Sequence, residues 1–106
     1  MSPQDRRAAE RFPVNRYTRC QFVGQVSEDF GAVRIQNVSN QGVGLLVGRR
    51  VEPGSLLSLT LTNTSKSFAR TFLVRVAHVT PQGGAFLVGG TFATPLTYDE
   101  LTALVM

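Results

Sequence analysis

Short runs of alternating apolar and polar residues, separated by turn-forming residues, are the feature that most restricts the fold of this chain. Successive side chains of a β-strand point to opposite faces, so a period of two predicts strands with one buried face. The apolar positions of the runs are Cys20, Phe22 and Val26; Val33 and Ile35; Val43, Leu45 and Val47; Leu57, Leu59 and Leu61; Phe72, Val74 and Val76; and Phe86, Val88 and Phe92. Six such strands predict an all-β domain, a six-stranded antiparallel β-barrel whose closure removes exposed strand edges.

Residues 97–106 change period and predict a short C-terminal α-helix. Thr97 and Glu100 have the spacing of a capping box, and Leu96 can staple onto Leu101. The expected apolar stripe of the helix is Tyr98, Leu101, Leu104 and Val105. Because so short a helix is marginal in isolation, we expect it to pack on the barrel as a lid or plug.

Residues 1–17 fit no strand pattern and predict a flexible basic arm. Five arginines crowd the segment and its border, namely Arg6, Arg7, Arg11, Arg16 and Arg19. Pro13 interrupts it, and such a charged stretch cannot bury itself. We therefore expect an arm over residues 1–17 and a barrel with its helix over residues 18–106.

The charge of the chain favours an anionic partner. Eleven basic residues oppose seven acidic ones in a chain of 106 residues, a length that suits one domain. Lys66 is the only lysine, so ten of the basic residues are arginines. The planar guanidinium suits bidentate contacts to phosphates and guanine edges better than an ammonium group does.

Several classes are excluded or disfavoured by what the sequence lacks. Cys20 is the only cysteine, which excludes an internal disulfide and a multi-thiolate metal site and fits a reducing cytoplasm. The first residues contain no apolar stretch of signal-peptide type, and the longest mostly apolar run, 42–48, is too short to cross a bilayer. We expect a cytoplasmic protein with no membrane insertion, metal or cofactor.

Two groups of residues can carry binding chemistry. Arg7 and Arg11 lie about 6 Å apart on one face if helical and about 13 Å apart if extended, and either geometry clamps a small anion. Asn37 to Gly42 forms a polar loop between two predicted strands, with a hydroxyl from Ser39 and a glycine that tolerates a positive φ. Taken alone, the arginine pair is typical of a solvated charge run and the loop of an ordinary turn.

Taken together, these residues resemble the PilZ domain family. Arg7-Ala8-Ala9-Glu10-Arg11 matches the RxxxR signature of that family, and Asn37-Val38-Ser39-Asn40-Gln41-Gly42 matches its [D/N]xSxxG signature. Supporting context comes from Phe12-Pro13-Val14, Gly42-Val43-Gly44-Leu45 and Val88-Gly89-Gly90-Thr91-Phe92. The resemblance runs from about Arg6 to Leu104 and implies a six-stranded barrel that binds the bacterial second messenger cyclic di-GMP.

The resemblance also implies ligand-binding roles. Arg7 and Arg11 are expected to hold guanine edges, base faces and phosphates, as guanidinium groups can. Asn37 and Ser39 are expected to hydrogen-bond guanine or phosphate, while Gly42 keeps the surface flat. Asn37 stands where many members carry aspartate, and since it accepts only through an amide oxygen, the expected effect is weaker binding at most.

Arg6 precedes the signature and supplies a third guanidinium. The hypothesis it supports is that the protein holds two stacked, intercalated cyclic di-GMP molecules. The competing interpretation, of equal weight at this point, is one more solvated charge.

The resulting prediction is a non-enzymatic cyclic di-GMP receptor or adaptor. Ligand binding is expected to order the arm across the barrel, with a hinge near Pro13. Because one domain accounts for the length of this sequence, the signal is expected to pass to an unidentified effector protein in trans.

Three alternatives remain open at this point. A ligand-independent PilZ-type interaction module is the first, although the intact arginine pair disfavours it. A small basic nucleic-acid-binding barrel is the second; DNA and RNA are not expected partners, because the aromatic residues fall mostly on apolar strand faces or in turns. An enzyme using a Cys20–His78 dyad is the least favoured, since His78 is expected in the core or at its rim and no third orienting group is visible.

Overall fold

The alternating stretches form β-strands, as their period predicts. The computed structural model describes residues 10–23 and 33–106. Within these ranges the strands are β1 Phe12–Pro13, β2 Thr18–Phe22, β3 Val33–Val38, β4 Gly42–Val47, β5 Leu56–Asn63, β6 Phe68–Gln82 and β7 Ala85–Phe92. A 3₁₀ turn, η2 (Thr64–Lys66), joins β5 to β6, and the helix α2 (Tyr98–Val105) follows β7.

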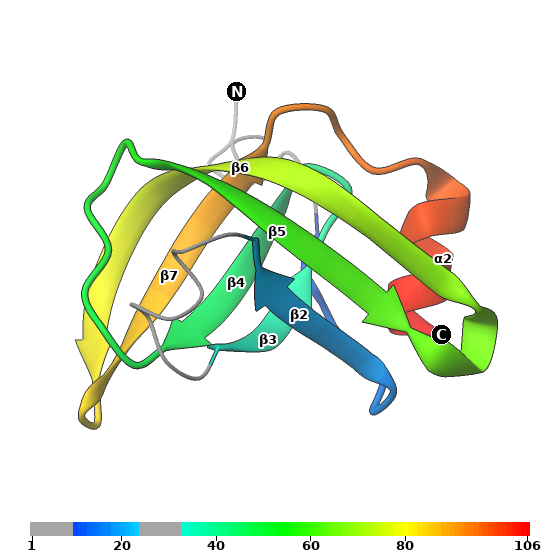
Figure 1. The fold of residues 1–106 in the computed structure, drawn as a ribbon, viewed down its shortest axis with the longest axis horizontal. Helices are drawn as coiled ribbons and strands as arrows, with labels where there is room; N and C mark the ends of the chain where they lie inside the picture. Colours follow the sequence, from blue (N-terminus) through cyan, green and yellow to red (C-terminus); the bar gives the residue numbers. More distant parts are fainter. Residues whose placement is uncertain (1–9, 24–32) are drawn as a thin grey trace.

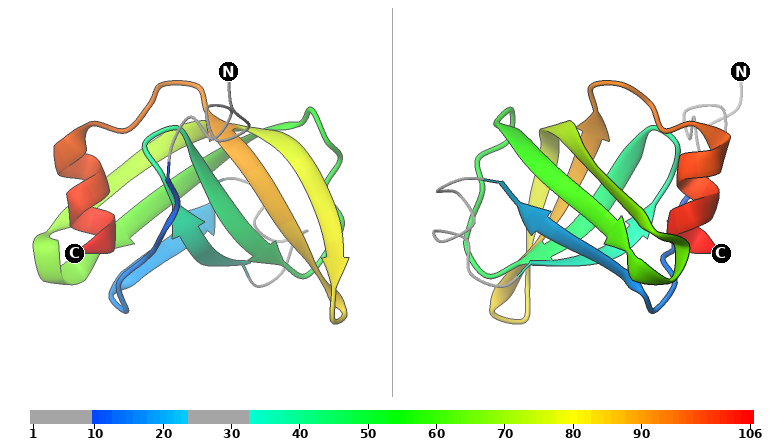
Figure 2. Two further views of the ribbon diagram at one scale, coloured as in Figure 1. Left: turned by 180° about the vertical axis from the view of Figure 1, so that it is seen from behind. Right: turned by 45° about the vertical axis from the view of Figure 1, so that its right-hand side comes forward.

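All strand pairs are antiparallel, and the sheet order is β1-β3-β4-β7-β6-β5-β2. Figures 1 and 2 show the sheet curled into a half-barrel, with α2 against one end. The all-β class is confirmed, but two details differ from the expectation. The described part of the chain contains seven strands rather than six, and β2 and β3 do not pair, so a seam stays open where full closure was expected.

The additional strand is β1, in a segment expected to contain none. Phe12 lies opposite Val38 and Pro13 opposite Asn37. Proline has no N–H to donate, so it is tolerated on an edge strand, which is the place of β1 in the sheet. A pair of residues is too short to show alternation, which is why the sequence pattern missed this strand.

The inward faces of the strands form the core at the predicted positions. Leu57, Leu59 and Leu61 are buried, and the rings of Phe72 and Phe92 meet with centroids 5.3 Å apart. The remaining buried apolar residues are Phe22, Ile35, Val38, Val43, Leu45, Val47, Val51, Val74, Val76, Val88, Leu96 and Leu104. Cys20, Val33 and Phe86 are partly buried against this core, and Val26 lies outside the described residues.

A β-bulge in β6 overturns the expected position of His78. The register of β6 against β7 shifts between Val76 and His78. An extra residue in one strand moves the following side chains to the other face. His78 is therefore exposed on the outer face, and Val79 packs against the core instead.

The predicted capping box of α2 is confirmed. Thr97 Oγ1 accepts a hydrogen bond from the Glu100 N–H at 3.1 Å, and Glu100 Oε1 accepts one from the Thr97 N–H at 2.8 Å. Arg70 of β6 forms an ion pair with Glu100 and ties the first turn to the sheet. Tyr98 is 79% exposed, so its expected place in the apolar stripe is wrong. No helix in the described ranges is long and apolar enough to cross a membrane.

The last turn of α2 is held by three donors from distant segments. The Leu104 carbonyl accepts from the Asn15 N–H at 3.0 Å and from Thr18 Oγ1 at 2.7 Å. The Ala103 carbonyl accepts from Asn63 Nδ2 at 2.8 Å. These donors satisfy carbonyl groups that a helix end leaves unpaired. The chain is thus anchored to the barrel at Asn15, shortly after β1.

Candidate functional site

The two sequence motifs meet at the side chains of Arg11 and Asn37. Arg11 Nη1 donates a hydrogen bond of 3.0 Å to Asn37 Oδ1. The contact forms because β1 pairs with β3 and Pro13 lies opposite Asn37, which brings the end of the arm over the second motif. Arg6 and Arg7 lie outside the described residues, so the structure gives no position for them.

Ser39 holds the turn that follows Asn37. Its Oγ accepts hydrogen bonds from the Gln41 N–H at 3.2 Å and the Gly42 N–H at 3.0 Å, and its own N–H donates to the Gly42 carbonyl at 2.9 Å. The residue is only 3% exposed. Ser39 therefore fixes the backbone of the turn between β3 and β4.

Position 42 requires glycine because a side chain would clash with its neighbours, not because the backbone adopts a positive φ. A Cβ at this position would lie 2.4 Å from the carbonyl oxygen of Gly90 and 3.4 Å from Arg11 Nη2. The glycines with positive φ in the described ranges are Gly54, Gly83 and Gly84, so the left-handed conformation expected at Gly42 is wrong. The neighbouring strand β7 and the Arg11 guanidinium leave no room for a side chain.

Gly44 is a site residue that the sequence reading did not single out. It lies directly opposite Asn37 in the β3–β4 pair. A Cβ on Gly44 would come within 2.6 Å of Asn37 Oδ1, so the amide group lies over this glycine. The signal was the Gly42-Val43-Gly44 repeat, in which two glycines share one face of a strand.

The row of buried glycines continues into β7 and ends at His78. Gly89 lies opposite Gly44 on one side and opposite His78 on the other. A Cβ on Gly89 would lie 2.3 Å from both Cε1 and Nε2 of the imidazole, so the ring stands over this glycine. The row Asn37, Gly44, Gly89, His78 is thus a glycine strip with a polar side chain at each end.

A second row runs beside the strip and adds another guanidinium. Gly42 lies opposite Thr91, and Thr91 lies opposite Arg75 of β6. Thr91 and Arg75 are exposed. We call the surface made by Arg11, Asn37, Gly42, Gly44, Gly89, His78, Thr91 and Arg75 the outer platform.

The outer platform suits a flat anionic ligand. Two of its members are arginines and none is acidic. Arg11 uses Nη1 to contact Asn37, and a guanidinium has further N–H donors. The glycines let the side chains of Arg11, Asn37 and His78 lie close against the sheet, and these side chains supply the donors and acceptors.

The described residues offer neither a metal-binding cluster nor a reactive cysteine. They contain no group of three or more His, Cys, Asp or Glu side chains that could hold a metal ion. Burial raises the pKa of the Cys20 thiol to about 12, which keeps it protonated and unreactive at neutral pH. Cys20 packs against the core while His78 is exposed on the outer face, so the two do not form the dyad that the sequence left open.

Comparison with known protein families gives one match. The family model described as "PilZ domain" matches residues 5–106, which include both motifs, all seven strands and α2. No curated protein matches the chain at a significant level.

Proposed function

This chain belongs to the PilZ domain family, a family of cyclic di-GMP receptors, and from that premise we propose that it binds cyclic di-GMP on the outer platform. The observation that carries the proposal is the hydrogen bond between Arg11 and Asn37 beside two glycines, Gly42 and Gly44. It supports a clamp in which both motifs face one surface. A ligand-independent interaction module would not need these polar groups aligned over a row of glycines.

The polar groups of the two motifs have counterparts on the ligand. Cyclic di-GMP is a dianion with two guanines, and each guanine edge offers O6 and N7 as acceptors for a guanidinium fork. Arg7 and Arg11 take these edges, the base faces or the phosphates. Asn37 Oδ1, which accepts from Arg11 in the free protein, accepts instead from the N–H groups of a guanine. Ser39 fixes the turn that follows Asn37, and the missing side chain at Gly42 leaves room for the Arg11 guanidinium.

His78 forms the far wall of the site in this proposal. Asn37 and His78 are separated by three strand spacings, which is about 14 Å at the usual distance between neighbouring strands. Those three spacings separate the two backbones; the Asn37 amide and the His78 ring lean toward each other over Gly44 and Gly89, which are direct neighbours across β4 and β7, so one ligand can contact both side chains. An imidazole standing at the edge of the strip offers a flat face for stacking on a base.

The proposed output is a change in the arm that a partner protein reads. The ligand bridges the arginines of the arm to the platform, while Asn15 keeps the following chain fixed to α2. The loop of the second motif also accepts two hydrogen bonds: the Leu96 N–H, in the segment before α2, donates to the Asn40 carbonyl at 2.7 Å, and the Phe92 N–H, at the end of β7, donates to the Gln41 carbonyl at 2.9 Å. An effector in trans that contacts the arm or α2 would then sense the ligand.

The presence of Arg6 leads to a proposal about the number of ligand molecules bound per protomer. A third guanidinium in the arm favours a second ligand molecule stacked on the first. Titration calorimetry should then saturate at two ligands per protomer for the wild type and at one for Arg6→Ala. Saturation at one ligand for both proteins would reject the intercalated dimer while leaving the receptor function intact.

The decisive experiment is calorimetry with cyclic di-GMP, cyclic di-AMP and GTP. We expect saturable binding of cyclic di-GMP alone, lost in Arg7→Ala and retained in Lys66→Ala, a cation in η2 away from the platform. Absence of binding by the wild type would overturn the proposal and favour the interaction module. Strongly salt-dependent binding of an oligonucleotide, unaffected by cyclic di-GMP, would instead support the nucleic-acid-binding alternative.

A further inference from the structure

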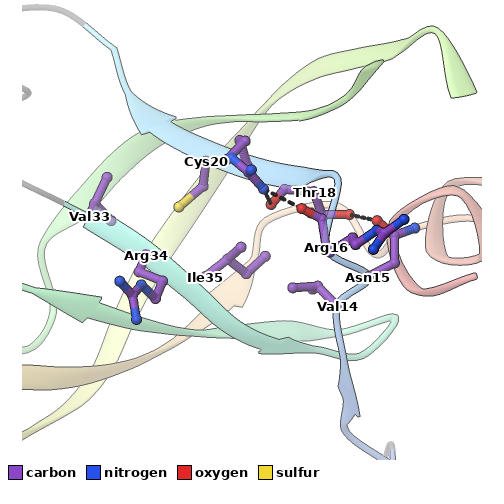
Figure 3. A pocket seen from close by; sticks show the side chains of 9 residues that line it. Val14, Asn15, Arg16, Thr18, Cys20, Val33, Arg34 and Ile35 are labelled. Carbon is purple, nitrogen blue, oxygen red and sulfur yellow. Dashed lines mark hydrogen bonds between the residues drawn. The ribbon is translucent and has the colours of Figure 1, made fainter. Parts of the chain in front are cut away.

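The open seam between β2 and β3 contains a cavity that is separate from the outer platform. Its volume is about 480 Å³, and it is lined by Val14, Asn15, Arg16, Thr18, Arg19, Cys20, Val33, Arg34 and Ile35. Figure 3 shows the Cys20 sulfur directed from β2 toward β3, with Ile35 across the gap. Small-molecule sites occupy roughly 300–1,000 Å³, so a compact ligand fits.

The cavity lies where β2 and β3 face each other without pairing. Among the described strands, β2 pairs only with β5, and β3 pairs with β4 on one side and with the two residues of β1 on the other. Val33 and Ile35 lie in β3 before the stretch that pairs with β1. A completed barrel would have filled this space with a ladder of backbone hydrogen bonds.

The inner lining of the cavity is apolar. Ile35 is 6% exposed and belongs to the core, and Val14, Val33 and Cys20 pack against that core. Because burial keeps the Cys20 thiol protonated, this wall bears no charge at neutral pH. The inner lining therefore favours an alkyl or aryl group over water.

The rim of the cavity is cationic. The Arg34 side chain makes no hydrogen bond or ion pair with any described residue. Arg19 Nη1 donates hydrogen bonds to the carbonyls of Arg16 and Thr18, which leaves the other guanidinium nitrogens of Arg19 free to donate. Arg16 stacks on Tyr17, with the guanidinium carbon 5.0 Å from the ring centroid. No lining residue is acidic, so an anion is the matching charge.

We propose that the seam cavity binds a small amphiphile with one anionic head and a short apolar chain. The head contacts Arg34 and Arg19 at the rim, and the chain lies between Cys20 and Ile35. This inference goes beyond cyclic di-GMP recognition and uses none of the platform residues. The shared chemistry covers a carboxylate, as in a fatty acid, and a phosphate, as in a lipid headgroup.

The test is an amide chemical-shift titration with four eight-carbon probes. Octanoate and octyl phosphate carry the anionic head, while octylammonium and octanol keep the chain and change or remove the charge. We expect saturable shifts at Cys20, Val33 and Ile35 with the anionic probes only, and the tighter of the two identifies the head group. Acetate, which has the head without the chain, should give none.

Two variants with the same charge change sharpen the test. Arg34→Glu should weaken octanoate and octyl phosphate about tenfold, the effect of losing one charge-assisted contact, whereas Lys66→Glu should leave both unchanged. Equal loss in the two variants, equal binding of octylammonium, or shifts that never saturate would each overturn the proposal. Cyclic di-GMP titrated into the same proteins reports the platform separately, so failure of one site is distinguishable from failure of the other.

Discussion

Arg11 Nη1 and Asn37 Oδ1, from residues 26 positions apart in the chain, are joined by a hydrogen bond of 3.0 Å. The bond depends on β1, because the pairing of Pro13 with Asn37 brings the end of the arm to the second motif. Both partners are accessible, so a ligand can displace the bond without unfolding the strand. The free protein thus holds half of the proposed clamp near its binding geometry, which lowers the ordering cost of binding.

Arg11→Ala should weaken cyclic di-GMP binding at least about tenfold, since a charge-assisted contact contributes about 1.5–3 kcal/mol. The free energy of unfolding should change by no more than about 0.5 kcal/mol, because the side chain is exposed. Calorimetry and urea unfolding measure the two effects. Arg11→Lys should not restore full affinity, since an ammonium lacks the planar fork. Full affinity in Arg11→Ala would contradict the role of the arm.

Gly44→Ala and Gly42→Ala should separate binding from stability. The added Cβ at Gly44 meets the amide end of Asn37, which can rotate away, so the fold is kept but Asn37 loses its position. The Cβ at Gly42 meets a backbone carbonyl of β7 that cannot yield, so unfolding should become easier by about 1–3 kcal/mol. We expect Gly44→Ala to lose ligand affinity at near-normal stability. Equal destabilisation by both variants would contradict this distinction.

The alternation of apolar residues predicted the core because burial acts on each strand face locally. The burial of Leu57, Leu59 and Leu61 could be predicted without knowing which residues they pack against. The capping box of Thr97 and Glu100 is likewise a local device, and it was predicted correctly. Side chains whose environment is set within a few residues can be read from the sequence.

Features set by pairing between distant strands were missed. Gly44 and Gly89 matter because they lie opposite each other, and the register that aligns them is fixed by the whole sheet. His78 was expected on the apolar face, because a bulge adds one residue without a local signature. The resemblance to the PilZ domain family supplied Arg11 and Asn37 as ligand-binding residues but not their direct hydrogen bond, whereas composition alone indicated only an anionic ligand.

Thr97→Ala should destabilise the domain by about 1 kcal/mol through loss of the N-cap. For a domain of this size that corresponds to a fall in melting temperature of roughly 4–8 °C. Thr102→Ala makes the same chemical change inside α2, where alanine is the better helix former, and should not lower the melting temperature. Thermal unfolding by circular dichroism measures both. Equal melting temperatures for wild type and Thr97→Ala would show that the capping box contributes nothing to stability.

His78→Ala should weaken cyclic di-GMP binding several-fold, because base stacking on a ring contributes about 1–3 kcal/mol. Stability should be nearly unchanged, since the imidazole is exposed. His78→Phe keeps a flat ring and should restore most of the affinity if stacking is the contribution. A hydrogen-bonding role would leave His78→Phe as weak as His78→Ala. Affinity unaffected by either change would remove His78 from the site.

The buried thiol of Cys20 predicts a loss of stability at alkaline pH. Its pKa is raised by desolvation from 9.0 to about 12 in the folded protein, so the unfolded chain releases the proton more readily. The contribution is fully present below about pH 9 and is lost as the pH rises toward about 12. Urea unfolding at about pH 8 and about pH 10.5 should therefore show a larger fall in the free energy of unfolding for wild type than for Cys20→Ala. Because other groups titrate equally in both proteins, the difference between the two falls isolates Cys20. An identical fall in the free energy of unfolding for the two proteins would mean that the thiol is accessible to water in the folded state. The apolar lining of the seam cavity would then be hydrated.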